Sequence, residues 1–293
     1  APNLGELFKG SSQGTSAVTD TPRGSTSIEN VLTGSVGNSG LVPESSNTWT
    51  VGGVITPDSL LPGLSFSVDY YSISITKAIS TLTAQQELDQ CAAGAQQECS
   101  FIQRNGSGGL ARVLLPYFNA ASRLTKGEDI EIDYTTNLAD WNWGGLDGTL
   151  TTRLIANHLD RFETNVLSGV PLEFAGSLNN NTPAWKWVLQ ANYSLDALSV
   201  FVQERFIGGG KYDRSKSAAQ LGGNQQGGVY YTDATLRYDV TDETQAYFTI
   251  NNLFDRDPPG YPSTLISGPN FSNRTLYDMI GRTFTVGVRF RTD

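Results

Sequence analysis

The sequence has no long hydrophobic run. None of its 293 residues fall in a stretch of the roughly 18 consecutive apolar residues that a membrane-spanning helix requires. The opening residues Ala1-Pro2-Asn3-Leu4 also lack the basic and apolar regions of a signal peptide, which predicts a chain that has been processed or is a fragment. These absences argue against a helical span but not against a membrane, because strands of about 9–11 residues cross a bilayer when they close into a barrel.

Histidine and cysteine are scarce. His158 is the single histidine and lies far along the sequence from the two cysteines, Cys91 and Cys99, which argues against a metal site. The cysteines stand in a polar segment at a spacing that a disulfide closes easily in an oxidising compartment. We therefore expect a disulfide, with two free thiols as the alternative.

Motifs for catalysis and for cofactor binding are also missing. No Gly-framed serine accompanies His158 as a nucleophile. The glycines at 208–210 and 222–223 lack the downstream lysine of a phosphate-binding loop, so we interpret them as flexible loop. We expect no enzyme, no cofactor, no metal and no nucleic-acid partner. An outer-membrane lipase that depends on His158 is the enzymatic alternative.

The composition that is present suits strands joined by turns. The chain carries 31 Gly, 12 Pro, 13 Phe, 12 Tyr and 5 Trp, with a formal net charge of -9. The aromatic residues recur inside alternating segments rather than in one cluster. The chain therefore has apolar surface to bury, either in a core or in a lipid bilayer.

Alternation of apolar and polar residues predicts the strands. It is cleanest near the C-terminus, where one face collects Phe284, Val286, Val288 and Phe290. Residues 184–193 repeat it with Trp185 and Trp187 at one end and Tyr193 at the other, as in an interfacial aromatic girdle. With weaker copies included, we predict nine strands, at 46–56, 63–76, 126–138, 147–158, 184–194, 197–207, 229–239, 243–254 and 277–291, and a further short strand at 111–119.

The links between these strands alternate in length. Short links are expected at 57–62, 138–146, 194–196 and 239–242, and long polar or Gly-rich links at 8–44, 76–125, 159–183, 208–228 and 255–276. Outer-membrane barrels have short periplasmic turns and long extracellular loops. A soluble β-sandwich or propeller is the alternative, although the long links on one side count against a sandwich and the lack of a blade-length repeat counts against a propeller.

Two motifs near the C-terminus carry a family resemblance. Residues 248–259, FTINNLFDRDPP, resemble the penultimate strand and its exit in TonB-dependent outer-membrane receptors, and residues 278–290, DMIGRTFTVGVRF, resemble the final strand. Supporting matches lie at 1–8, 41–52 and 68–71, and the cysteine segment with 102–105 and 127–134 resembles a subset of the family that has a cysteine pair in one extracellular loop. One departure is that Arg291-Thr292-Asp293 follow Phe290, where this family commonly ends on an aromatic residue.

The resemblance implies a fold and a function. The fold is all-β, an antiparallel transmembrane β-barrel of the outer-membrane type, in which residues 1–293 supply about nine or ten strands of a larger barrel and contain no second domain. The function is an outer-membrane receptor that imports a bulky nutrient of the siderophore, cobalamin or oligosaccharide class with energy coupled through TonB. A passive channel or structural barrel protein without a plug is the alternative. The family's assembly machinery reads the final strand, which assigns that role to Phe284, Val286, Val288 and Phe290.

Several partners follow from the strand count. Barrels of this kind have about 22 strands, so nine or ten cannot close one. An open edge in hydrocarbon leaves about ten backbone groups unpaired, at several kcal/mol each. We therefore expect the rest of the barrel and the plug, through which the TonB complex acts, in the same precursor or a second chain. The other expected partners are lipid, lipopolysaccharide and a small-molecule nutrient.

Only one loop offers candidate ligand contacts. Within 208–228, Lys211, Arg214 and Lys216 surround Tyr212, a set suited to an anionic chelate or sugar, although a solvated loop near lipopolysaccharide phosphates is the stronger interpretation. Trp141 and Trp143, beside a short link, are expected to anchor the periplasmic interface. Trp185, Trp187, Phe284, Val286 and Val288 are expected to face lipid.

Overall fold

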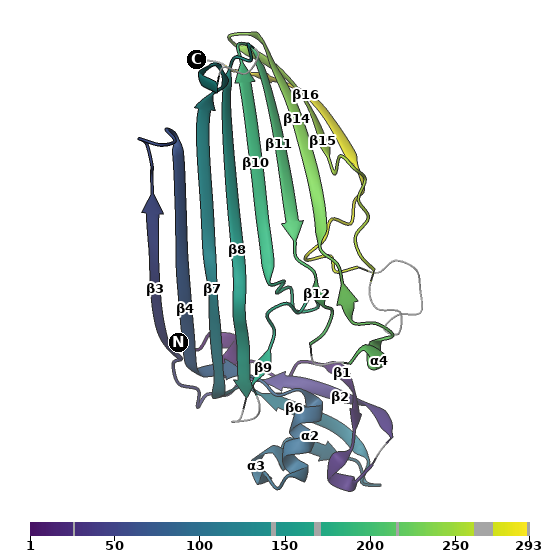
Figure 1. Ribbon diagram of the computed structural model, residues 1–293. Coiled ribbons are helices and arrows are strands. Elements are labelled where there is room, and N and C mark those ends of the chain that lie inside the picture. The colour runs from purple at the N-terminus through teal and green to yellow at the C-terminus, as the bar shows by residue number, and fades with distance from the viewer. Residues whose placement is uncertain (26, 142–144, 167–170, 215–216, 261–271, 292–293) are drawn as a thin grey trace. The chain divides into compact units, whose positions relative to one another are not determined.

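The computed structural model describes residues 1–25, 27–141, 145–166, 171–214, 217–260 and 272–291 (Figure 1). Contacts divide the chain into two compact units. Unit 1 comprises Ala1–Asn47, Ile73–Leu124 and Thr164–Leu172, and unit 2 comprises Thr48–Ser72, Thr125–Glu163 and Glu173–Asp293. Within the described ranges, no helix is both long enough and apolar enough to cross a membrane. The expectation of one barrel portion without a second domain stays a prediction.

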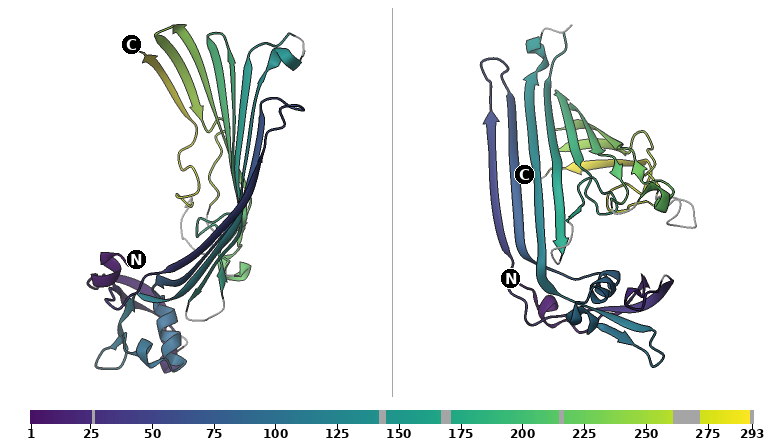
Figure 2. Two further views of the ribbon diagram at one scale, coloured as in Figure 1. Left: turned by 90° about the vertical axis from the view of Figure 1, so that its left-hand side faces the viewer. Right: turned by 60° about the horizontal axis from the view of Figure 1, so that its bottom comes forward.

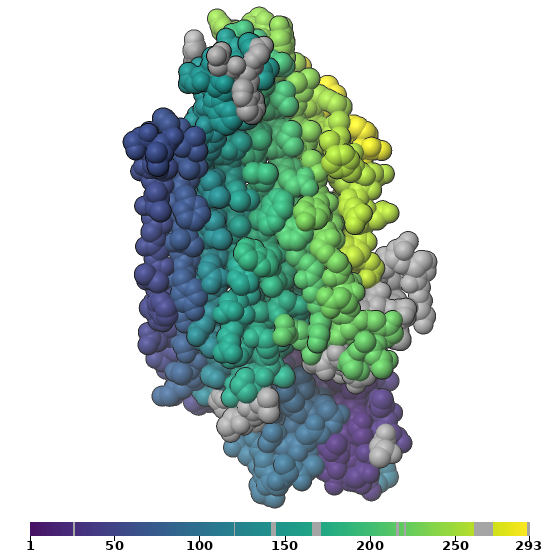
Figure 3. Space-filling model, viewed as in Figure 1, coloured from purple at the N-terminus to yellow at the C-terminus, as the bar shows by residue number. Residues whose placement is uncertain are grey.

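Unit 2 is built on one large twisted sheet, whose strands lie side by side in Figure 3 and curve together in Figure 2. From β8 to β16 each neighbouring pair of strands is antiparallel. In the described part of the chain the order across the sheet is β16 (Thr283–Phe290), β15 (Thr244–Asn251), β14 (Val229–Thr241), β11 (Leu198–Ile207), β10 (Trp185–Leu195), β8 (Thr149–Val166), β7 (Phe118–Asn137), β4 (Leu64–Ser80) and β3 (Ser45–Ile55), with β9 (Leu172–Glu173) beside β8.

All nine predicted strands are present, but three predicted boundaries are wrong by six residues or more. β7 begins at Phe118 rather than at 126, β8 continues to Val166 rather than ending at 158, and β16 begins at Thr283 rather than at 277. The added segments read FNAASRLT and LDRFETNV, in which polar residues fall on both faces. Sequence alternation marks a strand only where one face is apolar, so it misses strand residues with two polar faces.

The register of unit 2 separates an apolar face from a polar face. Residues directly opposite each other on antiparallel strands share a face. One row across β10, β11, β14, β15 and β16 reads Tyr193, Val200, Leu236, Phe248 and Val286. The adjacent row, on the other face, reads Asn192, Phe201, Thr235, Thr249 and Thr285. On the apolar face, Phe284, Val286, Val288 and Phe290 are exposed, with Val286 at 78 %.

The short connections of unit 2 gather at one end of the sheet. The links between β10 and β11 and between β14 and β15 lie there with the C-terminal end of β16. The link that contains β12 (Gly210–Lys211) and the described parts of the β15–β16 connection, 252–260 and 272–282, lie at the opposite end (Figure 1). Asp196 turns the β10–β11 hairpin with a positive φ of 48°. Short and long links therefore occupy opposite ends, as the alternating link lengths predict.

Unit 1 contains a second, smaller sheet. Its strand order is β1 (Gly14–Thr19), β2 (Ile28–Val36), β6 (Leu110–Pro116) and β5 (Ile102–Arg104), with β2 and β6 parallel. The helix α2 (Ala84–Ala92) is capped by Thr83 and packs Leu88 against a core of Val18, Val31 and Val113. The short elements α1 (Leu4–Phe8), η1 (Thr21–Arg23) and α3 (Gln96–Cys99) also lie in this unit.

Two expectations for unit 1 need correction, and two are confirmed. The segments 8–44 and 76–125, expected as long links, fold into this sheet and its helices. The 3 residues of β5 are too few for a visible alternation, and in β2 the apolar residues Val31 and Leu32 fall on opposite faces. The short strand expected at 111–119 is β6. Cys91 and Cys99 form the expected disulfide, with an S–S distance of 2.09 Å, which joins α2 to α3.

Candidate functional site

The polar face of the unit 2 sheet carries a hydrogen-bonded network on β7 and β8. Arg153 contacts the carboxylate of Glu131 and lies 3.5 Å from that of Asp133. Asn157 donates to the carboxylate of Asp129, with an N···O distance of 2.8 Å. The three acids alternate along β7 and so project from one face. The side chains of the Arg153 pairs are each more than a third exposed, so these pairs order the surface more than they stabilise the fold.

The same face continues onto β11 and β14 with a second charged group. Arg205 lies 3.3 Å from Asp233 and 2.7 Å from Asp278, measured from guanidinium nitrogen to carboxylate oxygen. Its guanidinium also lies 5.4 Å from the centre of the Tyr231 ring. Gln203 donates to Asp233 at 3.4 Å. Polar groups therefore line this face on β7, β8, β11 and β14, which suits contact with water or with a polar partner.

The opposite face is hollowed around aromatic side chains. An apolar depression there is lined by Ile130, Ile132, Leu154, Ala156, Trp185, Trp187, Leu189 and Phe206. The Trp187 and Phe206 rings stack at 5.3 Å, and Tyr230 lies 4.6 Å from Phe206. Trp185, 41 % exposed, and Trp187 thus share the face of Phe284, Val286 and Val288. Their contact with lipid stays a prediction.

Glu204 is an acid on this apolar face. Glu204 stands directly opposite Leu189 on one side and Thr232 on the other. The Thr232 hydroxyl donates a hydrogen bond to the Glu204 carboxylate. The acid is therefore held by the sheet itself rather than left without a partner.

Two of the four predicted ligand residues line one cavity. Lys211, in β12 (Gly210–Lys211), and Arg214 border a cavity of about 380 Å³ that also includes His158 and Glu173. Arg214 donates to the carbonyl oxygen of Ala175 at 2.6 Å. Tyr212 lies in the same loop, its backbone amide bonded to Asn224, and Lys216 lies outside the described residues. A ligand role for these residues stays a prediction.

His158 belongs to this site through contacts that sequence reasoning missed. Its Nδ1 lies 2.7 Å from a carboxylate oxygen of Glu128, and its ring stacks on Trp185 with a centroid distance of 4.3 Å. Trp185 stands directly opposite His158 in the β8–β10 register. The three residues come from three strands, so only the strand register could have revealed the group. It offers hydrogen bonds and a ring surface but no nucleophile among its named members.

The loop around this cavity is tightly packed. A Cβ on Gly210 would stand 2.4 Å from the carbonyl oxygen of Gly176, and one on Gly209 would stand 2.6 Å from that of Gln226. The loop from 174 to 183 is anchored by Leu178, which is fully buried and bonded through its amide to the Lys211 carbonyl at 2.9 Å. Gly209 and Gly210 therefore each allow a close backbone approach, a role that the sequence interpretation did not include. The flexibility of this loop stays a prediction.

The NNLFD motif forms a buried corner after β15. Asn252, 2 % exposed, adopts a positive φ of 52°, and its side chain exchanges hydrogen bonds with the backbone of Arg256 at 2.8 and 3.0 Å. The backbone N–H of Asn252 donates to the Asp233 carboxylate, with an N···O distance of 2.8 Å. Asp255 also has a positive φ, of 54°, and accepts the amide of Arg282 at 2.8 Å. The motif thus ties the β15–β16 connection back to β14.

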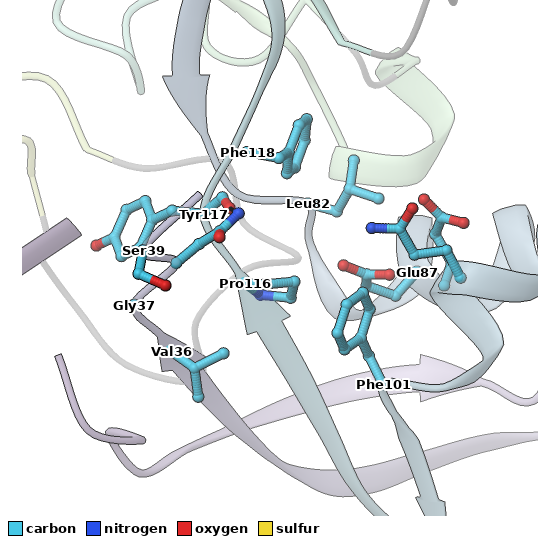
Figure 4. A pocket seen from close by; sticks show the side chains of 12 residues that line it. Val36, Gly37, Ser39, Leu82, Glu87, Phe101, Pro116, Tyr117 and Phe118 are labelled. Atoms are coloured by element: carbon cyan, nitrogen blue, oxygen red, sulfur yellow. Dashed lines mark hydrogen bonds between the residues drawn. The ribbon is translucent and has the colours of Figure 1, made fainter. Parts of the chain in front are cut away.

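Unit 1 has a cavity of its own, of about 470 Å³ (Figure 4). Glu87 lines it and is 1 % exposed, and its Oε2 atom has no hydrogen-bond partner. Burial, with a smaller effect of Glu98, raises the pKa of Glu87 to about 7. Nothing in the local sequence marks this residue, because its burial depends on segments far from α2.

A second buried carboxylate in unit 1 has an ion-pair partner. Asp20, 4 % exposed, accepts two hydrogen bonds from the Arg104 guanidinium, at 2.7 and 2.8 Å. These bonds hold the pKa of Asp20 below its usual value. Across the described ranges, His, Cys, Asp and Glu side chains form no group of three or more that could hold a metal ion.

The features of unit 2 define a class of protein. A wide antiparallel sheet with one apolar face, one polar face and its short turns at one end is part of an outer-membrane β-barrel. Residues 1–253 match the family described as TonB dependent receptor-like, beta-barrel, and the chain belongs to this family. The resemblance to this family is therefore confirmed.

Solved structures of known receptors share the fold. A mutant ferric enterobactin receptor (PfeA) from Pseudomonas aeruginosa in complex with enterobactin has a TM-score of 0.63 and 16 % identity, with 99 % of this chain and 36 % of that chain covered. The siderophore receptor PirA from Acinetobacter baumannii has a TM-score of 0.59 and 15 % identity, with 99 % of this chain and 37 % of that chain covered. The FrpB iron transporter from Neisseria meningitidis has a TM-score of 0.51 and 14 % identity, with 87 % of this chain and 32 % of that chain covered. The chain thus spans about a third of their length. No curated protein matches its sequence.

Proposed function

We propose that the chain is part of an outer-membrane receptor that imports an iron–siderophore complex, with energy coupled through TonB. The observation that carries the proposal is a sheet with one apolar face and one polar face, in a chain that belongs to the TonB-dependent receptor barrel family. The names of the similar solved structures, a ferric enterobactin receptor, a siderophore receptor and an iron transporter, favour iron over the cobalamin and oligosaccharide classes. Import rather than catalysis is the activity we assign.

The two faces have different roles in this proposal. The apolar face, with Val286 and Phe284, contacts the bilayer, where an exposed apolar side chain is stabilising. The polar face, with the Arg153 and Arg205 groups, lines the lumen and contacts water and the plug. β3 and β16 stand at the two ends of the strand order, so we propose that further strands of the same barrel pair with them.

The cavity beside Lys211 is the proposed contact for the iron complex. A formal charge of -9 repels an anionic chelate, so local cations matter for its approach. Lys211 and Arg214 supply two positive charges at one cavity, in a loop cluster that is already ordered. Asp160 and Glu173 line the same cavity, and the Glu173 carboxylate accepts the backbone amides of Phe162 and Ala175, so a chelate would contact the cations rather than a uniformly positive surface. Ordering before binding reduces the entropy that the loop loses on binding.

Uptake of radioactive iron by cells tests the function. The complete receptor is expressed in an iron-starved strain that lacks its own receptors, and a panel of ferric siderophores is supplied. We expect energy-dependent uptake of at least one complex, abolished by an uncoupler. Uptake that survives the uncoupler would favour a passive channel, and uptake of none would refute the iron assignment.

A charge variant tests the cavity. Lys211→Ala removes an exposed cation of the cavity, and Lys186→Ala removes an exposed cation of β10 as the matched control. We expect the half-saturating concentration to rise about three- to tenfold for Lys211→Ala and to stay unchanged for the control. Equal effects of both variants would show that only the net charge matters.

A further inference from the structure

The cavity of unit 1 has the side chains of a binding site. In the view of Figure 4, Glu87, Phe101 and Leu82 lie on one side of it and Tyr117 and Ser39 on the other, with Pro116 between them. Its volume of about 470 Å³ falls in the range of sites for small molecules. It lies within unit 1 and shares no lining residue with the cavity beside Lys211.

The charge of this cavity has one sign. Among the described residues that line it, Glu87 and Glu98 are the only charged ones, and both are acids. They come from different helices, α2 and α3, which the disulfide joins. A ligand that complements this lining therefore carries a positive charge.

Glu87 is the group that lacks a partner. It is 1 % exposed, so water does not solvate it as it would solvate a surface acid, and its Oε2 atom has no hydrogen-bond partner. A buried polar atom without a partner is costly, and native structures retain few of them. A cationic donor in the cavity would supply the missing hydrogen bond and the opposite charge.

Aromatic rings line the same cavity. Phe101 comes from the segment after α3, Tyr117 links β6 to β7, and Phe118 is the first residue of β7. Aromatic faces attract organic cations, and rings combined with a carboxylate are the surroundings that an ammonium group prefers. From these observations we propose that the cavity binds a small molecule with an organic ammonium group, in which Glu87 is the counter-ion and the rings contact the carbon atoms beside the charge.

A divalent metal fits this lining less well. Calcium takes six to eight oxygen ligands, and the described part of the chain holds no group of three acidic, histidine or cysteine side chains at one point. The apolar side chains of Val36, Leu82 and Phe118 also suit a carbon skeleton rather than a hydrated ion.

The site predicts a dependence on pH. The cation needs an ionised Glu87, and the pKa of this carboxyl without ligand is about 7. Glu98 and Tyr117 are the other titratable groups at the cavity. Binding therefore strengthens as the pH rises through 7, and below it the affinity falls about tenfold for each pH unit, because a proton must leave before the cation binds.

Calorimetric titration of the complete detergent-solubilised protein tests the proposal. The probes are phenethylammonium chloride, the uncharged 2-phenylethanol of similar shape, and calcium chloride. We expect phenethylammonium to bind at pH 8, at least tenfold more weakly at pH 6, and more tightly than 2-phenylethanol by about tenfold or more. Binding of calcium without phenethylammonium, or equal binding of both organic probes, would overturn the proposal.

Variants locate the binding. Glu87→Gln keeps the shape of the side chain but removes the charge, and should reduce phenethylammonium affinity at pH 8 at least tenfold and abolish the pH dependence. Glu29→Gln, at an exposed position of β2 in the same unit, is the matched control and should leave binding unchanged. Phe101→Leu should weaken binding several-fold. Glu87→Gln that folds normally and binds like the parent would overturn the proposal, and circular dichroism checks the folding.

Discussion

Replacing Asn252 by alanine should destabilise the corner after β15 more than any neighbouring change in the NNLFD motif. The substitution removes two side-chain hydrogen bonds to Arg256 at a site that is 2 % exposed. It also leaves alanine at a φ of 52°, in the left-handed region that asparagine adopts more readily than alanine. The loss of two hydrogen bonds and the unfavourable backbone conformation of alanine should together lower the free energy of unfolding by about 2–4 kcal/mol.

The matched control is the preceding asparagine. Asn251 is exposed at the end of β15 and makes one side-chain hydrogen bond, to Thr283 at 3.2 Å. Asn251→Ala should cost less than about 1 kcal/mol. Asn252→Gly should fall between the two, because glycine loses the hydrogen bonds but accepts the positive φ.

Urea unfolding of the complete protein in detergent micelles, followed by tryptophan fluorescence, measures these differences. All variants are compared at one pH and one detergent concentration, because both change the apparent stability. If Asn252→Ala and Asn251→Ala shifted the midpoint equally, the buried corner would contribute no more than an exposed strand end. If Asn252→Gly were the most damaging variant, the backbone argument would fail.

Three further predictions concern packing, the cross-link and acid. Gly210→Ala should destabilise the loop cluster by about 1–3 kcal/mol through overpacking, seen as faster proteolysis, whereas Gly227→Ala, with open space around its Cβ, should not. Reduction of the disulfide should lower the stability of unit 1 by about 2.5 kcal/mol, measured by hydrogen exchange; full protection after reduction would contradict this. Because bonding to Arg104 lowers the pKa of Asp20, the pair stabilises unit 1 above about pH 4 and loses this effect as the pH falls, so Arg104→Gln should flatten the acid transition in circular dichroism.

The strand predictions were most accurate where apolar and polar residues alternate regularly, as expected of strands with one face toward lipid. Phe284, Val286 and Val288 alternate with polar residues because each faces away from the polar side of the sheet. The method failed where strands carry polar residues on both faces, as at the start of β7, and where strands are as short as β5. Alternation in the sequence shows which face of a strand a residue lies on only when one face is apolar and the other is polar.

The candidate sites depended on contacts that no local pattern records. Lys211 and Arg214 were identified from their loop, but their cavity is completed by His158 and Glu173, which other segments supply. Glu87 lies on a short polar helix and looks like a surface acid in the sequence. Its burial follows from the packing of distant segments, and that packing becomes visible only in three dimensions.

The order of strands in unit 2 has a consequence for how the chain folds. β10, β11, β14, β15 and β16 follow one another across the sheet in the order of the sequence, and the first two are joined by Asp196 and Ala197 alone. Such hairpins close short loops and form in about 1–10 μs. In unit 1, by contrast, the parallel pairing of Leu32 with Arg112 closes a long loop and waits for distant residues to meet. The strands from β10 to β16 therefore have a low contact order, and their hairpins form before the distant strands of the small sheet in unit 1 pair.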